Sequence, residues 1–96
     1  AENKLDDTIG GVLQHSQNTI DLRGKTVDEA LSYLEIEFDK MYTRGEEAVV
    51  IIHGHGFGKL KTAVRNFLTH TSYPLNFRGG KHGEGGDGVT VAEFST

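Results

Sequence analysis

The chain of 96 residues contains no cysteine. A disulfide framework is therefore excluded, and so are a thiolate metal site and a cysteine nucleophile. No apolar run approaches the ~20 residues that a membrane-spanning helix needs, and no signal-peptide pattern is present. We therefore expect an intracellular, cytoplasmic protein without a membrane partner. Because the chain begins at Ala1 rather than at methionine, we also expect it to be a piece of a longer protein.

The sequence is ordinary in its content of apolar and charged residues, with 35% hydrophobic and 25% charged. This composition is typical of a globular domain, and the length suffices for one modest core. Residues 1–18 are polar, and their few apolar positions are interrupted by Gly10 and Gly11. We interpret them as a linker or N-terminal arm. The remaining residues, 19–96, are predicted to form one domain that is monomeric in isolation.

Acidic residues outnumber basic ones, and the net charge of −4 at first argues against a nucleic-acid partner. The distribution of charge argues the other way. Residues 53–82 contain five lysines and arginines, four of the five histidines, and no Asp or Glu. Because local charge decides how a polyanion approaches, this segment predicts a surface for DNA or RNA. The alternative is a solvated helix face on which cations cluster by chance.

The stretch 48–59 is the most informative part of the chain. Residues 48–52 are apolar without alternation, which predicts a strand buried on both faces. The run ends at His53, and glycine then occupies every second position up to Gly58. From Lys59 the apolar residues follow a helical period to about His70. Ligands bind at the carboxyl ends of strands in open α/β sheets, and a glycine loop before a helix attracts anions. We therefore expect this loop to bind phosphate.

The other patterns predict three further strands, at 19–23, 75–78 and 89–94, and a helix at 26–42. Thr26 and Glu29 form a capping box at the start of that helix. A ten-residue loop with six glycines, at 79–88, joins the last two strands.

The predicted fold class is therefore an α/β (α+β) two-layer sandwich of order β-α-β-α-β-β, with two helices on a four-stranded mixed sheet. Two right-handed crossovers make the first three strands parallel, and the last strand is antiparallel to them. The carboxyl ends of the first three strands then lie at one edge of the sheet. Residues 21–24, 53–58 and 79–88 should therefore meet there and form one site.

Residues 20–24, 51–60 and 83–91 resemble the three signatures of the small MutS-related (Smr) domain. With Arg23, the first motif resembles the C-terminal Smr domain of the anti-recombination MutS paralogue. The resemblance implies a fold similar to the C-terminal domain of bacterial translation initiation factor three. It also implies binding and nicking of DNA in repair and recombination control, or cleavage of mRNA at stalled ribosomes. Carried over by position, it places at the site Asp21, Arg23, His53, Gly54, Gly56 and the glycines of the third motif.

Three residues are candidates for cleaving a phosphodiester. His53 titrates near neutrality and is the candidate general base or acid. Arg23 offers a planar fork that suits two phosphate oxygens. Asp21 could orient His53 or Arg23, or hold a divalent ion. The alternatives are that Asp21 only caps a turn or pairs with Arg23, and that His53 is a hydrogen-bonded residue at the end of a strand.

A larger set is expected to bind phosphate or nucleic acid through backbone amides, positive charge or imidazole. It comprises Gly54, His55, Gly56, Gly58, Lys59, Lys61, Arg65, Lys81, His82, Gly85 and Gly86. The alternative is that the charged members and the histidines only face solvent. Phe57, Tyr73 and Phe77 could stack on bases, although two of the three are expected in the core.

A two-metal nuclease needs several converging carboxylates, and only Asp21, Glu84 and Asp87 lie near the expected edge. We therefore expect no required cofactor and at most one divalent cation, Mg²⁺ or Mn²⁺. A mobile glycine loop at 79–88 would be a poor cage for it. Residues 54–59 are too short for a Walker A motif and lack its Ser or Thr, so ATP hydrolysis is not expected.

Three functions stay open at this point. The chain is an endonuclease domain acting on DNA or RNA, a non-catalytic module that binds nucleic acid or a ribosome, or a peptide-binding module. Cleavage that depends on His53 would favour the first, and salt-sensitive binding without product the second. No feature obviously reads a 2′-hydroxyl, so the sequence does not distinguish DNA from RNA.

Overall fold

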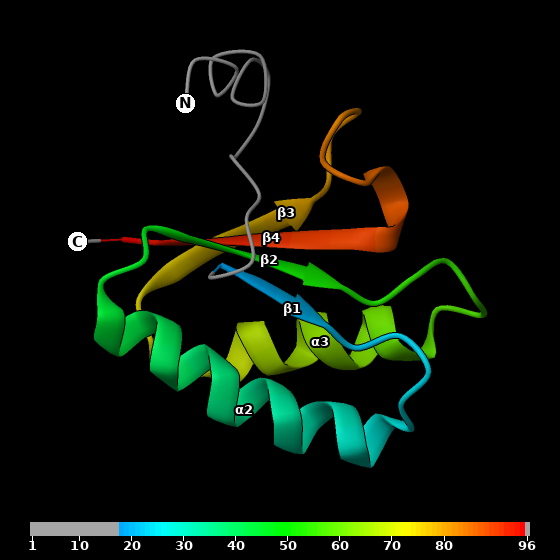
Figure 1. Cartoon of the computed structure of the whole chain (residues 1–96), viewed down its shortest axis with the longest axis horizontal. Helices are drawn as coiled ribbons and strands as arrows, with labels where there is room; N and C mark the ends of the chain where they lie inside the picture. The colour runs from blue at the N-terminus through cyan, green and yellow to red at the C-terminus, as the bar shows by residue number, and fades with distance from the viewer. Residues whose placement is uncertain (1–17, 96) are drawn as a thin grey trace.

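The computed structural model describes residues 18–95 of the chain, which contain four strands and two α-helices; Figure 1 shows their arrangement. In chain order these are β1 (Thr19–Asp21), α2 (Val27–Arg44), β2 (Ala48–Ile52), α3 (Lys59–His70), β3 (Leu75–Gly79), a short 3₁₀ turn (Gly86–Gly88) and β4 (Val89–Phe94). The predicted elements are all present, with ends that differ by at most two residues. The linker or arm predicted at 1–18 lies, apart from Asn18, outside the described residues.

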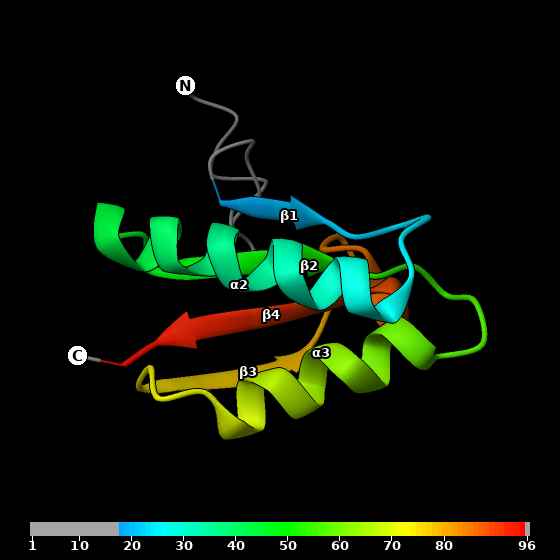
Figure 2. The ribbon, with the colours of Figure 1, turned by 90° about the horizontal axis from the view of Figure 1, so that it is seen from below.

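The four strands form one sheet in the order β1-β2-β4-β3. β1 and β2 are parallel, and β4 runs antiparallel to both β2 and β3. The first three strands therefore share one direction, as predicted, with β4 between the second and third. Figures 1 and 2 show that α2 and α3 lie side by side on one face of the sheet. The predicted two-layer sandwich is confirmed. Neither helix in residues 18–95 is long and apolar enough to cross a membrane.

β2 is buried on both faces, which explains its lack of alternation. Val49 and Ile51 belong to the main core beneath the helices. Val50 points to the opposite face, where it packs with Val89 and Val91 of β4. Along β4, Thr90 and Ala92 alternate with these valines and therefore lie on the other face of the sheet.

The main core is centred on Phe38 of α2. Its ring packs against those of Phe67, Tyr73 and Phe94, with centroids 5.8, 5.5 and 5.1 Å away. The residues of α2 that are buried, Ala30, Leu34, Phe38 and Met41, recur at helical spacing. These contacts fix the helices on the sheet and hold the strand ends in register.

The predicted capping box begins α2. The Glu29 N–H donates to the Thr26 hydroxyl oxygen at 3.2 Å, and the Thr26 N–H donates to the Glu29 carboxylate at 3.0 Å. We expect Thr26→Ala to lower the free energy of unfolding by about 1 kcal/mol, because the first turn loses an acceptor. Urea denaturation measures this. Thr43→Ala, at an exposed position near the other end of the helix, is the control, and an equal loss in both variants would contradict the prediction.

The loop 79–88 is held in place, in contrast to the mobile glycine loop expected from the sequence. The Glu84 carboxylate is buried and accepts two hydrogen bonds from the Arg78 guanidinium, at 2.6 and 2.9 Å. It also accepts the Lys81 N–H at 2.8 Å. At Gly85, where φ is +115°, a Cβ would collide with Val89 Cγ2. The glycines thus permit close folding of the loop, and the ion pair secures it.

Candidate nucleic-acid site

The three predicted segments meet at the carboxyl edge of the sheet. The Leu22 N–H donates to the Ile52 carbonyl at 2.8 Å. The N–H groups of His53 and Gly54 both donate to the Gly88 carbonyl, at 3.1 and 3.0 Å. Backbone hydrogen bonds therefore join the loops after β1 and β2 to the end of the loop between β3 and β4, and the predicted meeting of these segments is confirmed.

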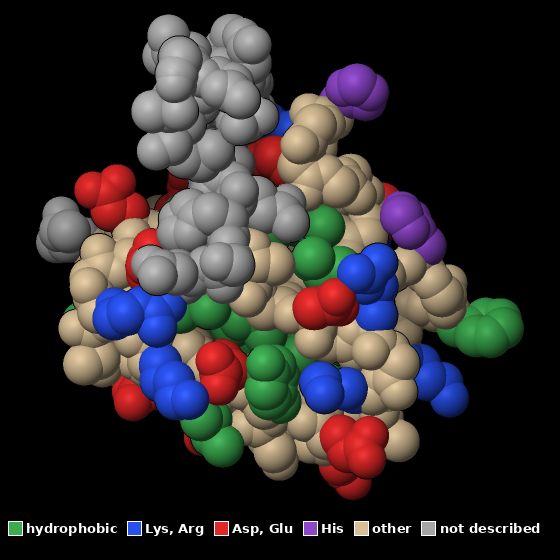
Figure 3. All heavy atoms as spheres, viewed as in Figure 1, with side chains coloured by type: hydrophobic (Ala, Val, Ile, Leu, Met, Phe, Trp, Pro, Cys, Tyr) green, Lys and Arg blue, Asp and Glu red, His purple; other side chains and the backbone are tan. Residues whose placement is uncertain are grey.

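Two neighbouring hollows open at this edge, and Arg23, Gly54 and His55 line both. The first has a volume of about 350 Å³ and is bounded by the 53–58 loop and the start of α3. The second has a volume of about 420 Å³ and is bounded by the 83–85 turn and the start of β4. Figure 3 shows Lys, Arg and His side chains along the end of the molecule where the loops after β1 and β2 lie.

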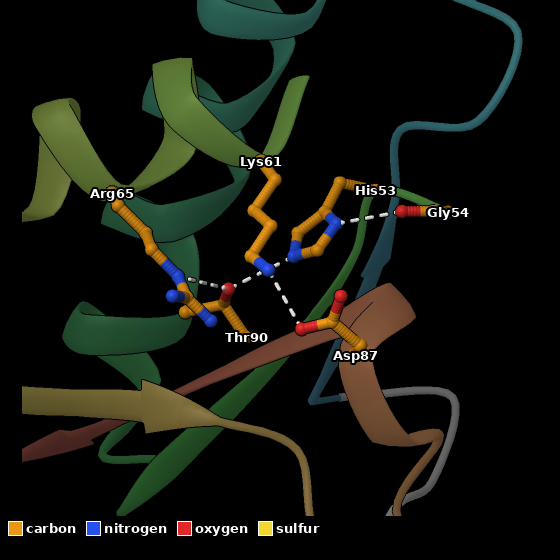
Figure 4. A network of polar contacts seen from close by, with 6 residues as sticks. All are labelled: His53, Gly54, Lys61, Arg65, Asp87 and Thr90. Carbon is orange, nitrogen blue, oxygen red and sulfur yellow. Dashed lines mark hydrogen bonds and ion pairs between the residues drawn. The ribbon is translucent and has the colours of Figure 1, made fainter. Parts of the chain in front are cut away.

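His53 is among the residues that line the first hollow, although it is only 5% exposed. Its Nδ1 is 3.0 Å from the Gly54 carbonyl oxygen and its Nε2 is 2.9 Å from Thr90 Oγ1 (Figure 4). A carbonyl can only accept, so we assign the hydrogen to Nδ1, and the Thr90 hydroxyl then donates to Nε2. Arg65 Nε donates to the same hydroxyl oxygen at 3.3 Å. Hydrogen bonds therefore run from Arg65 through Thr90 and a neutral imidazole to Gly54.

Burial lowers the pKa of His53 below its ordinary 6.5. The positive charges of Arg65 and Lys61 lower it further, whereas the hydrogen bond to Gly54 and the charge of Asp87 act in the opposite direction. The imidazole is therefore neutral at neutral pH, in agreement with the assigned hydrogen bonds.

This lowered pKa predicts a pH dependence of stability. The unfolded chain binds the His53 proton more tightly than the folded chain does. The stabilisation that buried, neutral His53 gives to the folded state is therefore complete above pH 6.5. It decreases as the pH falls toward the folded-state pKa. His53→Gln should remove this dependence from the free energy of unfolding measured by urea between roughly pH 7.5 and 5. Carboxylates with lowered pKa values titrate below this window. His70→Gln, at an exposed position, is the control, and parallel curves for wild type and His53→Gln would contradict the prediction.

Arg23 and Asp21 form an exposed ion pair beside the hollows. Arg23 Nε and Nη2 donate to the two Asp21 carboxylate oxygens at 3.0 and 2.7 Å. This pairing lowers the pKa of Asp21. Of the roles considered for Asp21, the structure shows two: the pairing with Arg23, and the turn cap, in which Asp21 Oδ1 accepts the Arg23 N–H at 3.1 Å. These bonds use two of the five guanidinium N–H donors, so three are left for a phosphate.

The remaining predicted cations differ in their surroundings. Lys61 Nζ forms an ion pair with Asp87 Oδ1 at 2.6 Å, and Arg65 Nε donates a hydrogen bond to the Thr90 hydroxyl. Lys59 lines the first hollow at the start of α3 and is exposed. Gly58, with φ +84°, begins that helix and offers no side-chain acceptor to the first turn.

Not every predicted binding residue reaches the hollows. Gly56 and Gly58 line the first and Gly85 lines the second. Lys81 and His82 are exposed on the 79–88 loop but line neither hollow. Arg65 and Gly86, which are partly buried, also line neither hollow. Sequence reasoning missed Thr90. One signal was available. Thr90 lies on the same face of β4 as Ala92 and Phe94, so its hydroxyl is a polar group on an otherwise apolar face that packs under the helices.

The carboxylates at this edge are paired with cations and do not converge. Asp21 contacts Arg23, Glu84 contacts Arg78, and Asp87 contacts Lys61. In the part of the chain that the structure describes, no three His, Asp or Glu side chains come together as a metal site would require.

The chain has relatives of known family. The Smr domain family matches residues 20–95. The chain is 47% identical over 76 residues to the endonuclease MutS2 of Caldanaerobacter subterraneus subsp. tengcongensis. The matched residues cover 79% of this chain and 10% of that protein. It thus spans about a tenth of the length of that relative.

Solved structures agree with this comparison. The Smr domain of Thermus thermophilus MutS2 superposes with a TM-score of 0.78 at 34% identity, over 82% of this chain and 99% of that one. YdaL of Escherichia coli, a stand-alone small MutS-related protein, shares the fold with a TM-score of 0.80 at 20% identity, over 100% of this chain and 77% of that one. Sequence family, fold and motif positions agree, and the chain belongs to the Smr domain family.

Proposed function

We propose that this domain binds DNA or RNA at the carboxyl edge of its sheet and nicks the phosphodiester backbone there. The observation that carries the proposal is the convergence of all three motif loops on two hollows that Arg23 and His55 both line, with Lys59 in the first. Relatives that share its family are named endonucleases. We further propose that the domain is the C-terminal part of a cytoplasmic MutS2-like protein that acts on DNA in repair and recombination.

Phosphate binding would use the charges and donors at the hollows. The three remaining N–H donors of Arg23 suit the oxygens of one phosphate, and Asp21 would keep the guanidinium in place. Lys59 adds a point charge, and residues 54–58 line the same hollow as these two cations. Because phosphate contacts of this kind do not read sequence, binding should be general and sensitive to salt.

Proton transfer would use the imidazoles. From the sequence alone, His53 is the candidate for the direct role, but both of its ring nitrogens are hydrogen-bonded inside the protein. The geometry supports a different division of roles. His55 is exposed and lines both hollows, so it can exchange a proton with a substrate oxygen or a water molecule. His53 is a positioning residue that ties the loop to β4 through Thr90.

We propose no resident metal, because the nearby carboxylates are paired with cations; at most one Mg²⁺ or Mn²⁺ would enter with the substrate phosphates.

The test is incubation of the 96-residue chain with end-labelled single- and double-stranded DNA and RNA, with and without EDTA. Product fragments together with salt-sensitive binding are expected. Salt-sensitive binding without product would favour the alternative, a non-catalytic module for nucleic acid or a ribosome. Binding that ignores both salt and cation substitutions would favour a peptide ligand.

Removal of one cation gives a quantitative prediction. Lys59→Ala should weaken binding and lower the slope of log affinity against log salt by about 0.7 to 0.9, the value of one phosphate contact. Fluorescence anisotropy at several salt concentrations measures this. Lys40→Ala, an exposed cation on α2 that pairs with Glu37, is the matched control. Equal slopes for wild type and Lys59→Ala would place the phosphate elsewhere.

A further inference from the structure

The side chain at the tip of the 54–58 loop is an aromatic ring held in solvent. Phe57 is fully exposed, at 102% of its reference area. The other large hydrophobic side chains that are exposed in residues 18–95 are on α2 and reach only 41–57%. Its neighbours Gly56 and Gly58 have no side chains that could shield the ring. The core is built from other aromatic rings, those around Phe38, so folding does not require Phe57.

The surroundings of this ring are cationic rather than apolar. Phe57 lines the first hollow together with Arg23, Lys59 and Lys61. An apolar protein surface would be a poor partner for a ring that shares its hollow with these cations. An aromatic ring beside phosphate-binding cations is instead the chemistry by which proteins hold single-stranded nucleic acid, where a base stacks on the ring while its phosphate meets the charge.

We propose that Phe57 stacks on an unpaired base next to the bound phosphate, so that the domain prefers single-stranded or locally unpaired nucleic acid to intact duplex. This inference rests on the proposed function and specifies its substrate class. Within a duplex both faces of each base are already stacked on neighbours, and opening a step for the ring has an energetic cost. Single strands, gaps and branch points offer a free face.

The chain contains no tryptophan, so Phe57→Trp introduces a sole indole whose fluorescence reports stacking directly. Titration with a single-stranded DNA oligonucleotide should quench this fluorescence, and a blunt duplex at equal bound fraction should quench it far less. Ile36→Trp, on α2 and 57% exposed, is the matched control and should not be quenched.

Affinities complete the test. Phe57→Ala should bind the single strand about 5- to 100-fold more weakly, with duplex binding nearly unchanged. Phe57→Leu, which is apolar but has no ring, should behave like Phe57→Ala, whereas Phe57→Tyr should behave like wild type. Unquenched Phe57→Trp, or Phe57→Ala that binds single strands as well as wild type, would overturn the inference while leaving the proposed function intact. Failure of wild type to bind any nucleic acid would instead refute the proposed function.

Discussion

Replacement of His55 by glutamine is expected to lower the nicking rate by about 10²-fold or more, the usual loss when a proton-transferring group is removed. Binding should change little, because Arg23, Lys59 and the loop amides remain. His55 is the exposed imidazole that lines both hollows. Single-turnover cleavage of a labelled strand, measured across pH, reports both the rate and the titrating group.

His53→Gln distinguishes positioning from direct chemistry. A glutamine amide oxygen can still accept the Thr90 hydroxyl but cannot take up a proton near neutral pH. We expect a smaller loss of rate than in His55→Gln and a pH–rate profile of unchanged shape. If His53→Gln abolishes nicking and His55→Gln cleaves like wild type, the direct role belongs to His53, as the sequence alone suggested.

Removal of Arg78 is expected to destabilise the domain more than loss of any other cation at this edge. Arg78→Ala leaves the Glu84 carboxylate, which is 4% exposed, without its guanidinium partner. Breaking a buried ion pair in this way costs 3–5 kcal/mol, and because the Arg78 side chain is itself 29% exposed we expect the lower end, about 3 kcal/mol. Urea denaturation measures the loss.

A second ion pair at the same edge is the natural comparison. Arg23 and Asp21 also pair through two hydrogen bonds, but their side chains are 62% and 46% exposed. Arg23→Ala should therefore cost less than about 1 kcal/mol. The double variant Arg78→Ala, Glu84→Ala should recover part of the stability lost in Arg78→Ala, because the buried carboxylate that lost its guanidinium is then also removed. Equal losses for Arg78→Ala and Arg23→Ala would show that Glu84 is hydrated and not dependent on Arg78.

The fold could be predicted because each local pattern has one physical solution. A β-branched run at residues 48–52 without alternation, which is too short for a typical helix, favours a strand covered on both faces. Thr26 and Glu29 mark the start of a helix through their reciprocal hydrogen bonds. The two helical crossovers make β1, β2 and β3 parallel, and their carboxyl ends therefore lie at one edge. These inferences do not depend on the details of side-chain packing.

The contacts within the site could not be predicted in the same way, because they depend on strand register. Pairing of β4 with β2 sets Thr90 opposite Ile51, close to the end of β2 where His53 follows. A shift of one residue would turn Thr90 to the other face of the sheet. The pairing of Glu84 with Arg78 likewise follows from how the glycine loop folds back, which no local pattern specifies.

Amide chemical shifts recorded during titration of the domain with a non-cleavable single-stranded oligonucleotide test the central proposal most directly. The site predicts that the largest changes occur together in residues 21–24, 53–58 and 83–88, and that they diminish as salt is added. Changes confined to the outer surfaces of α2 and α3, with these three loops unaffected, would contradict it.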